Sequence, residues 1–235
     1  MEKHGLTYGE YLKVDKLLKL QQLKSDPQEH DEMLFIIIHQ TYELWFKQVL
    51  HEFSKLNELF NKGDVFASVK TLRRILTILK TMVSQIDILE TMTPLEFNSF
   101  RGFLQNSSGF QSIQFRELEI LCGIRTRIML EAYRLQPGVT DLLKKRMEAE
   151  TIWEAFVVFV GNFGYKMTAK RIHTEGLLFE ANERNQDLLL HIMKNSPELA
   201  LVCELLVDFD EGLQEWRYRH VKMVERTIGN KRGTG

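Results

Sequence analysis

The sequence predicts an all-α protein, a bundle in which long core helices pack against one another. Apolar residues recur in alternating steps of four and three along two long segments, which is the spacing of one face of an α-helix. Only 4 Pro and 14 Gly occur in 235 residues, and this low number favours long helices over a turn-rich β fold. No segment alternates apolar and polar residues for long enough to predict a strand.

The N-terminal part begins with two predicted helices. Thr7 and Glu10 have the spacing of a capping box, in which each side chain bonds the backbone N–H of the other residue. The helix that they start is predicted to end near residues 25–27. A second helix is predicted from residue 27 or 31 to about residue 57. Its stripe consists of Phe35, His39, Tyr42, Phe46, Val49 and Phe53.

Two more helix starts follow. Asp64 is the predicted N-cap of a third helix, over residues 65–91. Thr93 begins another capping box, with proline at the first helical position, where its missing N–H costs nothing. The short helix that starts there carries Phe97 and Arg101 at positions i and i+4, so that both side chains lie on one face.

The C-terminal part is predicted to consist of further helices separated by short breaks. Turn residues at 106–109 and 136–138 interrupt the pattern, and Gly229 follows the last apolar residue, where helices commonly end. The predicted helices cover 110–121, 139–149, 151–162, 166–194 and 197–228. The last has a stripe made of Val202, Leu206, Phe209, Leu213, Trp216, His220, Met223 and Thr227.

The composition excludes several classes of protein. Hydrophobic residues make up 44%, which excludes a disordered chain, and a net charge of -1 gives no excess for binding nucleic acid. Residues 155–165, the longest mainly apolar run without charge, are too few to span a membrane, and no signal peptide is visible. Cys122 and Cys203 lack the spacing of a disulfide framework. We therefore expect a cytoplasmic protein that binds neither nucleic acid nor a membrane.

His39 and His220 occupy stripe positions where leucine would be expected. One interpretation is a core histidine whose ring bonds a backbone carbonyl. The other is a neutral imidazole that ligates a metal or a haem iron inside a helical bundle. A zinc site is a poor fit, because no second and third ligand follow at zinc-binding spacing.

A haem would also require cations for its two propionates. Basic residues surround the second histidine, namely Arg217, Arg219, Lys222, Arg226, Lys231 and Arg232. They could equally form a solvated face that complements the helix dipole. Arg101 offers a planar fork suited to a carboxylate, although a surface ion pair would also explain an isolated arginine. The patterns alone therefore predict an all-α protein with a candidate haem pocket.

Several segments together resemble one family, the tryptophan 2,3-dioxygenases, haem enzymes that open the indole ring of L-tryptophan. The segments are LTYGEYL (6–12), HDEMLFIIIHQ (30–40), ELW (43–45), LETMTP (89–94), FR (100–101), SSGFQS (107–112), WRYRH (216–220) and GNKRGTG (229–235). They extend from residue 6 to the last residue in the order found in the family. Each segment alone is a weak signal, but the joint match is highly specific.

The resemblance implies a haem site. His220 is implied to be the proximal ligand of the iron of haem b, and Ser108 and Gly109 are implied to line the haem. His39 is implied to be the catalytic distal histidine, which accepts a hydrogen bond from the indole N–H and positions the ring. Phe35, one turn earlier, is implied to pack against the indole.

The resemblance also implies how the amino-acid part of the substrate is held. Arg101 clamps the carboxylate, assisted by Thr234 from a closing glycine-rich loop, and Leu104 lines the pocket. Phe97 belongs to the same site. Some members of the family carry tyrosine where this chain has Phe97, so the hydroxyl contact to the carboxylate is expected to be absent here.

An oligomer follows from the same resemblance. Tyr8 and Tyr11, at positions i and i+3, are implied to reach into the pocket of a neighbouring subunit, as in a homotetramer built as a dimer of dimers. Residues 1–24 would then be a segment exchanged with the neighbour, and residues 25–235 a single helical catalytic domain.

The implied activity is cleavage of the indole C2–C3 bond by O2, the co-substrate, to give N-formyl-L-kynurenine, the first step of tryptophan catabolism by the kynurenine pathway. One alternative is a related haem-dependent oxygenase that acts on a substituted tryptophan or another aromatic amino acid. Another is a helical binding module with a degenerate pocket. The joint presence of His39, Arg101 and Thr234 argues against the binding module, since a scaffold needs none of them.

Overall fold

The protein is a helical bundle, and the predicted all-α class is confirmed. The computed structural model describes residues 5–105, 107, 109–125, 130–131, 133–134, 136–172 and 176–229. Its elements, in which η marks a 3₁₀-helix, are α1 (Tyr8–Leu12), α2 (Val14–Leu17), α3 (His30–Lys62), α4 (Val65–Leu89), α5 (Pro94–Arg101), η1 (Gly102–Leu104), η2 (Gly109–Gln111), α6 (Ile113–Leu121), β1 (Ile124–Arg125), α8 (Pro137–Glu148), α9 (Ile152–Gly161), β2 (Gly176–Leu177), α10 (Glu183–Asn195) and α11 (Pro197–Ile228).

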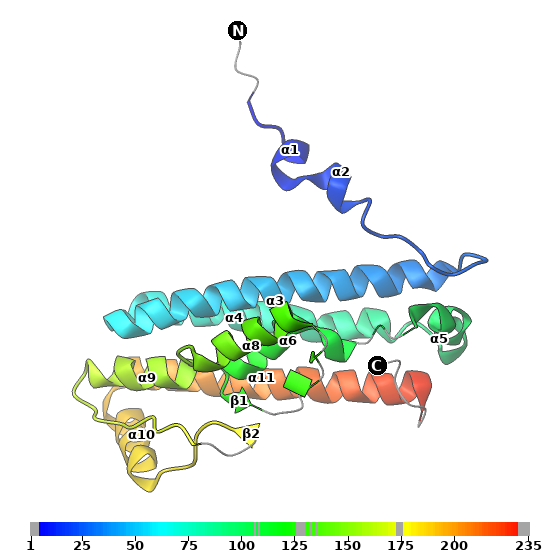
Figure 1. Ribbon diagram of the computed structural model, residues 1–235. Helices are drawn as coiled ribbons and strands as arrows, with labels where there is room; N and C mark the ends of the chain where they lie inside the picture. Colours follow the sequence, from blue (N-terminus) through cyan, green and yellow to red (C-terminus); the bar gives the residue numbers. More distant parts are fainter. Residues whose placement is uncertain are drawn as a thin grey trace.

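The long helices α3, α4 and α11 lie side by side and form the body of the bundle (Figure 1). Their apolar stripes are buried, as shown by Phe53, Leu72 and Val202, which are each 0% exposed. Gly212 lets α11 approach α4 closely, because a Cβ at this position would lie 2.9 Å from Cδ2 of Leu79. This tight packing fixes α11 against the bundle about two turns before His220.

The helix starts predicted from Thr7, Asp64 and Thr93 are confirmed, whereas α6 begins at Ile113 and α8 begins at Pro137, inside the predicted turn. The capping boxes that begin at Thr7 and Thr93 both form with reciprocal hydrogen bonds, and the Asp64 carboxylate accepts the N–H of Ala67 at 3.0 Å. The last helix ends before Gly229, as predicted. Helix α3 continues past its predicted end to Lys62.

Two other predicted helices differ more in extent. The first is split at Lys13, whose φ of 56° is left-handed, and its second piece ends at Leu17, well before residues 25–27. Residues 21–25 lie outside any helix. Among the described residues of the range 166–194, only those of α10 are helical. Residues before it instead form β2, which pairs antiparallel with β1 through Ile124 and Leu177.

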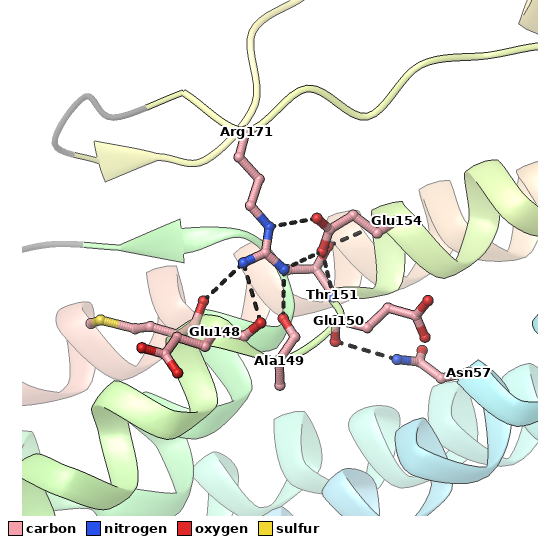
Figure 2. Close-up of polar contacts among 8 residues, drawn as sticks. Asn57, Glu148, Ala149, Glu150, Thr151, Glu154 and Arg171 are labelled. Carbon is pink, nitrogen blue, oxygen red and sulfur yellow. Dashed lines mark hydrogen bonds and ion pairs between the residues drawn. The ribbon is translucent and has the colours of Figure 1, made fainter.

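The irregular segment before β2 is held by Arg171, whose guanidinium contacts the end of α8 and the start of α9 (Figure 2). Its Nε and Nη2 atoms donate to the two carboxylate oxygens of Glu154, and Nη2 also donates to the Ala149 carbonyl at 2.7 Å. Nη1 donates to the Met147 carbonyl at 3.2 Å. The side chain therefore ties this segment to the connection between α8 and α9.

We expect Arg171→Lys to destabilise the fold by roughly 1–3 kcal/mol, because lysine keeps the charge but lacks the planar fork that bonds a carboxylate and several carbonyls together. The measurement is the free energy of unfolding in urea. Arg184→Lys, on the exposed surface of α10, is the matched control. If the two variants are equally stable, the Arg171 contacts contribute nothing to the fold.

The N-terminal residues 5–20, which we call the arm, lead away from the bundle (Figure 1). Large apolar side chains along the arm are exposed, including Tyr8 at 77%, Tyr11 at 71% and Leu18 at 70%. The described part of the chain thus provides no cover for them.

Among the helices of the described part of the chain, none has both the length and the apolar character needed to cross a bilayer.

Candidate functional site

A cavity lies between α3, α5 and α11, with about 810 Å³ of space free of protein atoms, part of it open to solvent. The predicted site residues that line it are Phe35, His39, Phe97, Arg101, Leu104, Gly109 and His220. They come from four separate stretches of the sequence. The fold therefore brings together side chains that spacing along the chain could not relate to one another.

A second cavity of about 490 Å³ adjoins the first and shares four wall residues with it, namely His39, Leu89, Gly109 and His220. Both imidazoles therefore border the same two spaces, although they are carried by different long helices. The remainder of the second wall is mainly aromatic, with Tyr42, Phe46, Phe115 and Trp216.

The His39 ring is fixed in orientation and tautomer by its own helix. Its Nδ1 lies 2.7 Å from the carbonyl oxygen of Phe35, and because a carbonyl only accepts, Nδ1 carries the proton. Nε2 is therefore left as an acceptor. The Phe35 ring lies 4.0 Å from the His39 ring between centroids, and Phe100, which is 0% exposed, supports Phe35 at 5.6 Å.

The His220 ring is held by aromatic packing on α11. It stacks on Trp216, one turn earlier, with ring centroids 5.5 Å apart and planes inclined by 17°. Trp216 is itself buried, and its ring meets Phe46 edge-on at 5.7 Å. The imidazole plane is thus set by a packed aromatic cluster.

Both imidazoles are kept neutral by their surroundings. Burial lowers the pKa of His39, and this effect outweighs the opposing hydrogen bond to Phe35 and the charge of Glu43. Burial, followed by the nearby His39, lowers the pKa of His220. A neutral imidazole has a free lone pair, which is what a metal ligand or a hydrogen-bond acceptor requires.

These pKa shifts predict how the stability of the cofactor-free chain depends on pH. The unfolded chain takes up protons on these histidines near their ordinary pKa of 6.5, but the folded chain resists protonation because both pKa values are lower. The unfolded state therefore binds more protons, and the free energy of unfolding should decrease as the pH falls below 6.5. Urea titrations at a series of pH values measure this free energy of unfolding. His39→Gln should weaken the dependence, and an unchanged slope would contradict this assignment.

The donor set fits a cofactor that brings most of its own metal ligands. In the described ranges, no group of three or more His, Cys, Asp or Glu side chains converges as a metal site. A haem iron needs only one strong protein ligand in an apolar cavity, and His220 offers one. A Cβ built on Gly109 meets no atom within 4 Å, so the cavity wall is left open where a side chain would project.

Arg101 lies on the wall of the first cavity, one turn after Phe97 on α5. Arg101 is half-buried, and the rings of Phe35 and Phe97, which line the same cavity, lie 5.8 Å apart. A planar cation beside an aromatic wall can bind an amino acid that has a carboxylate and an aromatic side chain.

The basic residues near His220 that the structure describes do not form a propionate site on the cavity walls. Arg219 donates to Asp87 at 2.6 Å and to Glu90 at 3.0 Å, and Lys222 pairs with Glu225. Of the described basic residues in this group, which include Arg217 and Arg226, none belongs to the walls of the two cavities. Arg217 and Arg219 form ion pairs that join α11 to Glu119 of α6 and to the end of α4, and the interpretation as a solvated face of α11 fits Lys222.

Some predicted residues are not brought into this site. Tyr8 and Tyr11 lie on the exposed arm, away from the cavity of their own chain. Ser108, Thr234, Lys231 and Arg232 lie outside the described residues.

Other wall residues were not singled out from the sequence. They are Leu89, Met92, Ser107, Met223, Val224, Thr227 and Ile228. Periodicity had placed Met223 and Thr227 on the same helix face as His220 without assigning them to the site. Leu89 ends α4 and Met92 lies in the connection to α5, and their place on the cavity wall is apparent only in the folded chain.

Comparison with known proteins gives consistent matches. A family model described as tryptophan 2,3-dioxygenase matches residues 1–151. A curated tryptophan 2,3-dioxygenase of Herpetosiphon aurantiacus is 48% identical over 234 residues, which are 98% of this chain and 89% of that protein. Proteins of the same name from an Anaeromyxobacter species and a Nocardioides species are 47% and 42% identical, again over 98% of this chain, and the matches cover 86% and 85% of those proteins.

Proposed function

The chain belongs to the tryptophan 2,3-dioxygenase family and is a tryptophan-cleaving dioxygenase, and we propose that its reaction takes place in the cavity bordered by His39 and His220. The observation that carries this proposal is the position of two neutral imidazoles, from α3 and α11, on the same cavity walls. The product is N-formyl-L-kynurenine, formed by cleavage of the indole C2–C3 bond of L-tryptophan.

His220 would hold haem b by ligating its iron, with the imidazole plane set by Trp216. Gly109, which leaves open space in the wall, would lie against the haem together with Ser108. When bound, haem supplies the iron centre at which O2 reacts. The fit depends on the neutral state of His220, because a protonated imidazole has no lone pair for a metal.

The substrate would be held by contacts at both of its ends. His39 Nε2, the free acceptor, would take the indole N–H, and Phe35 would pack on the indole ring. Arg101 would bind the carboxylate through a bidentate contact, assisted by Thr234. Phe97, which has no hydroxyl, would contribute only an apolar wall beside Leu104. His39 positions the ring and has no required role in removing the indole proton.

The exposed arm supports an oligomer in which residues 1–24 cross to a neighbouring subunit while residues 25–235 form the catalytic domain. Tyr8 and Tyr11 are more than two-thirds exposed in the single chain, at 77% and 71%. Burial of such side chains against a second copy would remove a large apolar area from water. We take the assembly to be a homotetramer built as a dimer of dimers.

The experiment that tests this function is product analysis. Reduced, haem-loaded protein is incubated with L-tryptophan and O2, and N-formyl-L-kynurenine is sought by mass spectrometry, with both oxygen atoms traced from labelled O2. We expect both labels in the product. Conversion of a substituted tryptophan, with L-tryptophan left intact, would instead identify a relative of different specificity.

A further inference from the structure

A buried carboxylate at the start of α3 holds residues 24 and 25, in the segment that joins the arm to α3. Glu32 is 1% exposed, and its two oxygens accept the backbone N–H of Lys24 at 2.8 Å and of Ser25 at 3.0 Å, together with the Ser25 hydroxyl. Burial alone would raise the pKa of Glu32, but the bonds from Ser25 and Lys24 bring the pKa below its ordinary 4.5. The carboxylate is therefore ionised and its hydrogen bonds are charge-assisted.

A second side chain of α3 holds the other end of the same stretch. Nε2 of Gln40 donates to the Leu20 carbonyl at 3.2 Å, and its Oε1 accepts from Nε2 of Gln21. Glu32 and Gln40 are about 12 Å apart along the helix, at a rise of about 1.5 Å per residue. Residues 20–25 are thus fastened to α3 at both ends, and the arm departs beside the turn that carries His39.

We propose that Glu32 and Gln40 are positioning residues, which fix the direction in which the arm leaves α3 so that its tyrosines reach the cavity of a neighbouring subunit. The inference rests on the proposed exchange of the arm. If residues 20–25 were not fastened to α3, the arm would sample many orientations. Its binding to the neighbouring subunit would then carry a larger entropic cost. Fastening these residues raises the effective concentration of Tyr8 and Tyr11 at the neighbouring site.

The experiment uses mixed oligomers in which the arm and the site come from different chains. One chain carries Tyr8→Ala and Tyr11→Ala and keeps an intact haem site. The other carries His220→Ala and keeps an intact arm. The two chains carry different affinity tags, are co-expressed and are isolated through both tags, and the turnover of L-tryptophan is measured. We expect the mixed oligomer to be active, because the arm of one chain completes the site of the other.

The decisive variant is Glu32→Gln, which keeps the size of the side chain and removes its charge. Placed in the chain that supplies the arm, it should lower turnover about tenfold, since the charge-assisted bonds to Lys24 and Ser25 weaken. Placed in the chain that supplies the site, it should leave turnover unchanged, which also shows that the variant folds. Gln40→Ala in the arm-supplying chain should lower turnover as well. Asp31→Asn, in the same helical turn, is the control and should have no effect.

Each result has one meaning. Loss of turnover from Glu32→Gln in either chain alike would overturn the inference, because the residue would then support the site itself. Equal turnover with and without the variant would overturn the role of Glu32 and leave the exchange standing. An inactive mixed oligomer with native Glu32 would overturn the exchange, and this inference with it. Separately, amide exchange at Lys24 and Ser25 in the haem-loaded protein should be faster in Glu32→Gln, and unchanged exchange would also overturn the inference.

Discussion

His220→Ala is expected to abolish stoichiometric binding of haem. Helix α11 presents this imidazole to the cavity, and we proposed it as the ligand of the iron. Alanine would leave an apolar space without a donor for iron. The described cavity walls contain no cysteine, and their other histidine, His39, has its ring orientation fixed by the bond to the Phe35 carbonyl. The measurement is the Soret absorbance per chain after reconstitution with haem, compared with the native protein.

The matched control is His39→Ala, which removes the imidazole from the other long helix. We expect this variant to retain haem, with a changed affinity for L-tryptophan, because His39 is assigned to the substrate. Far-ultraviolet circular dichroism shows whether each variant is folded. A normal Soret band in His220→Ala, with loss of the band in His39→Ala, would reverse the two assignments.

Local signals in the sequence predicted most helix starts, because a cap depends on residues three positions apart. Thr93 is an example, since its side chain and that of its partner satisfy each other's backbone N–H groups without help from the rest of the chain. Helix extent was less predictable. The stretch around Arg171 has no helix-breaking pattern, and its irregular path depends on Glu154 and on carbonyl groups of the α8–α9 connection. Such long-range bonds leave no periodic signal in the sequence.

The site residues, too, were predictable where the signal is local and unpredictable where it depends on tertiary packing. Periodicity placed His39 and His220 on the buried faces of two helices, and it left open whether they were core residues or ligands. Periodicity could not predict that both rings border the same space, because this arrangement depends on how α3 packs against α11. The resemblance to a family supplied this expectation, and the two shared cavity walls agree with it. Leu89 and Met92 remained unpredicted, since their place on the wall depends on where α4 ends.

Arg101→Ala is expected to raise the KM for L-tryptophan severely, on the order of a hundredfold. A bidentate contact between guanidinium and carboxylate consists of charge-assisted hydrogen bonds worth roughly 1.5–3 kcal/mol each, and each 1.4 kcal/mol corresponds to about a tenfold change in affinity. Arg101 lies on the cavity wall beside Phe97, so that its carboxylate contact would also align the indole. Misalignment should therefore lower kcat as well. Steady-state kinetics of the haem-loaded variant give both constants.

Tryptamine, which has the indole and the amine but no carboxylate, separates this role from general damage to the cavity. The native protein should bind tryptamine weakly, because the guanidinium then faces the ligand without its partner. Arg101→Ala should bind tryptamine at least as well as the native protein does, so that the preference for L-tryptophan disappears. Arg101→Lys should recover only part of the affinity for L-tryptophan, since an ammonium lacks the planar fork. If Arg101→Ala weakens the binding of both ligands equally, the side chain supports the wall and does not read the carboxylate.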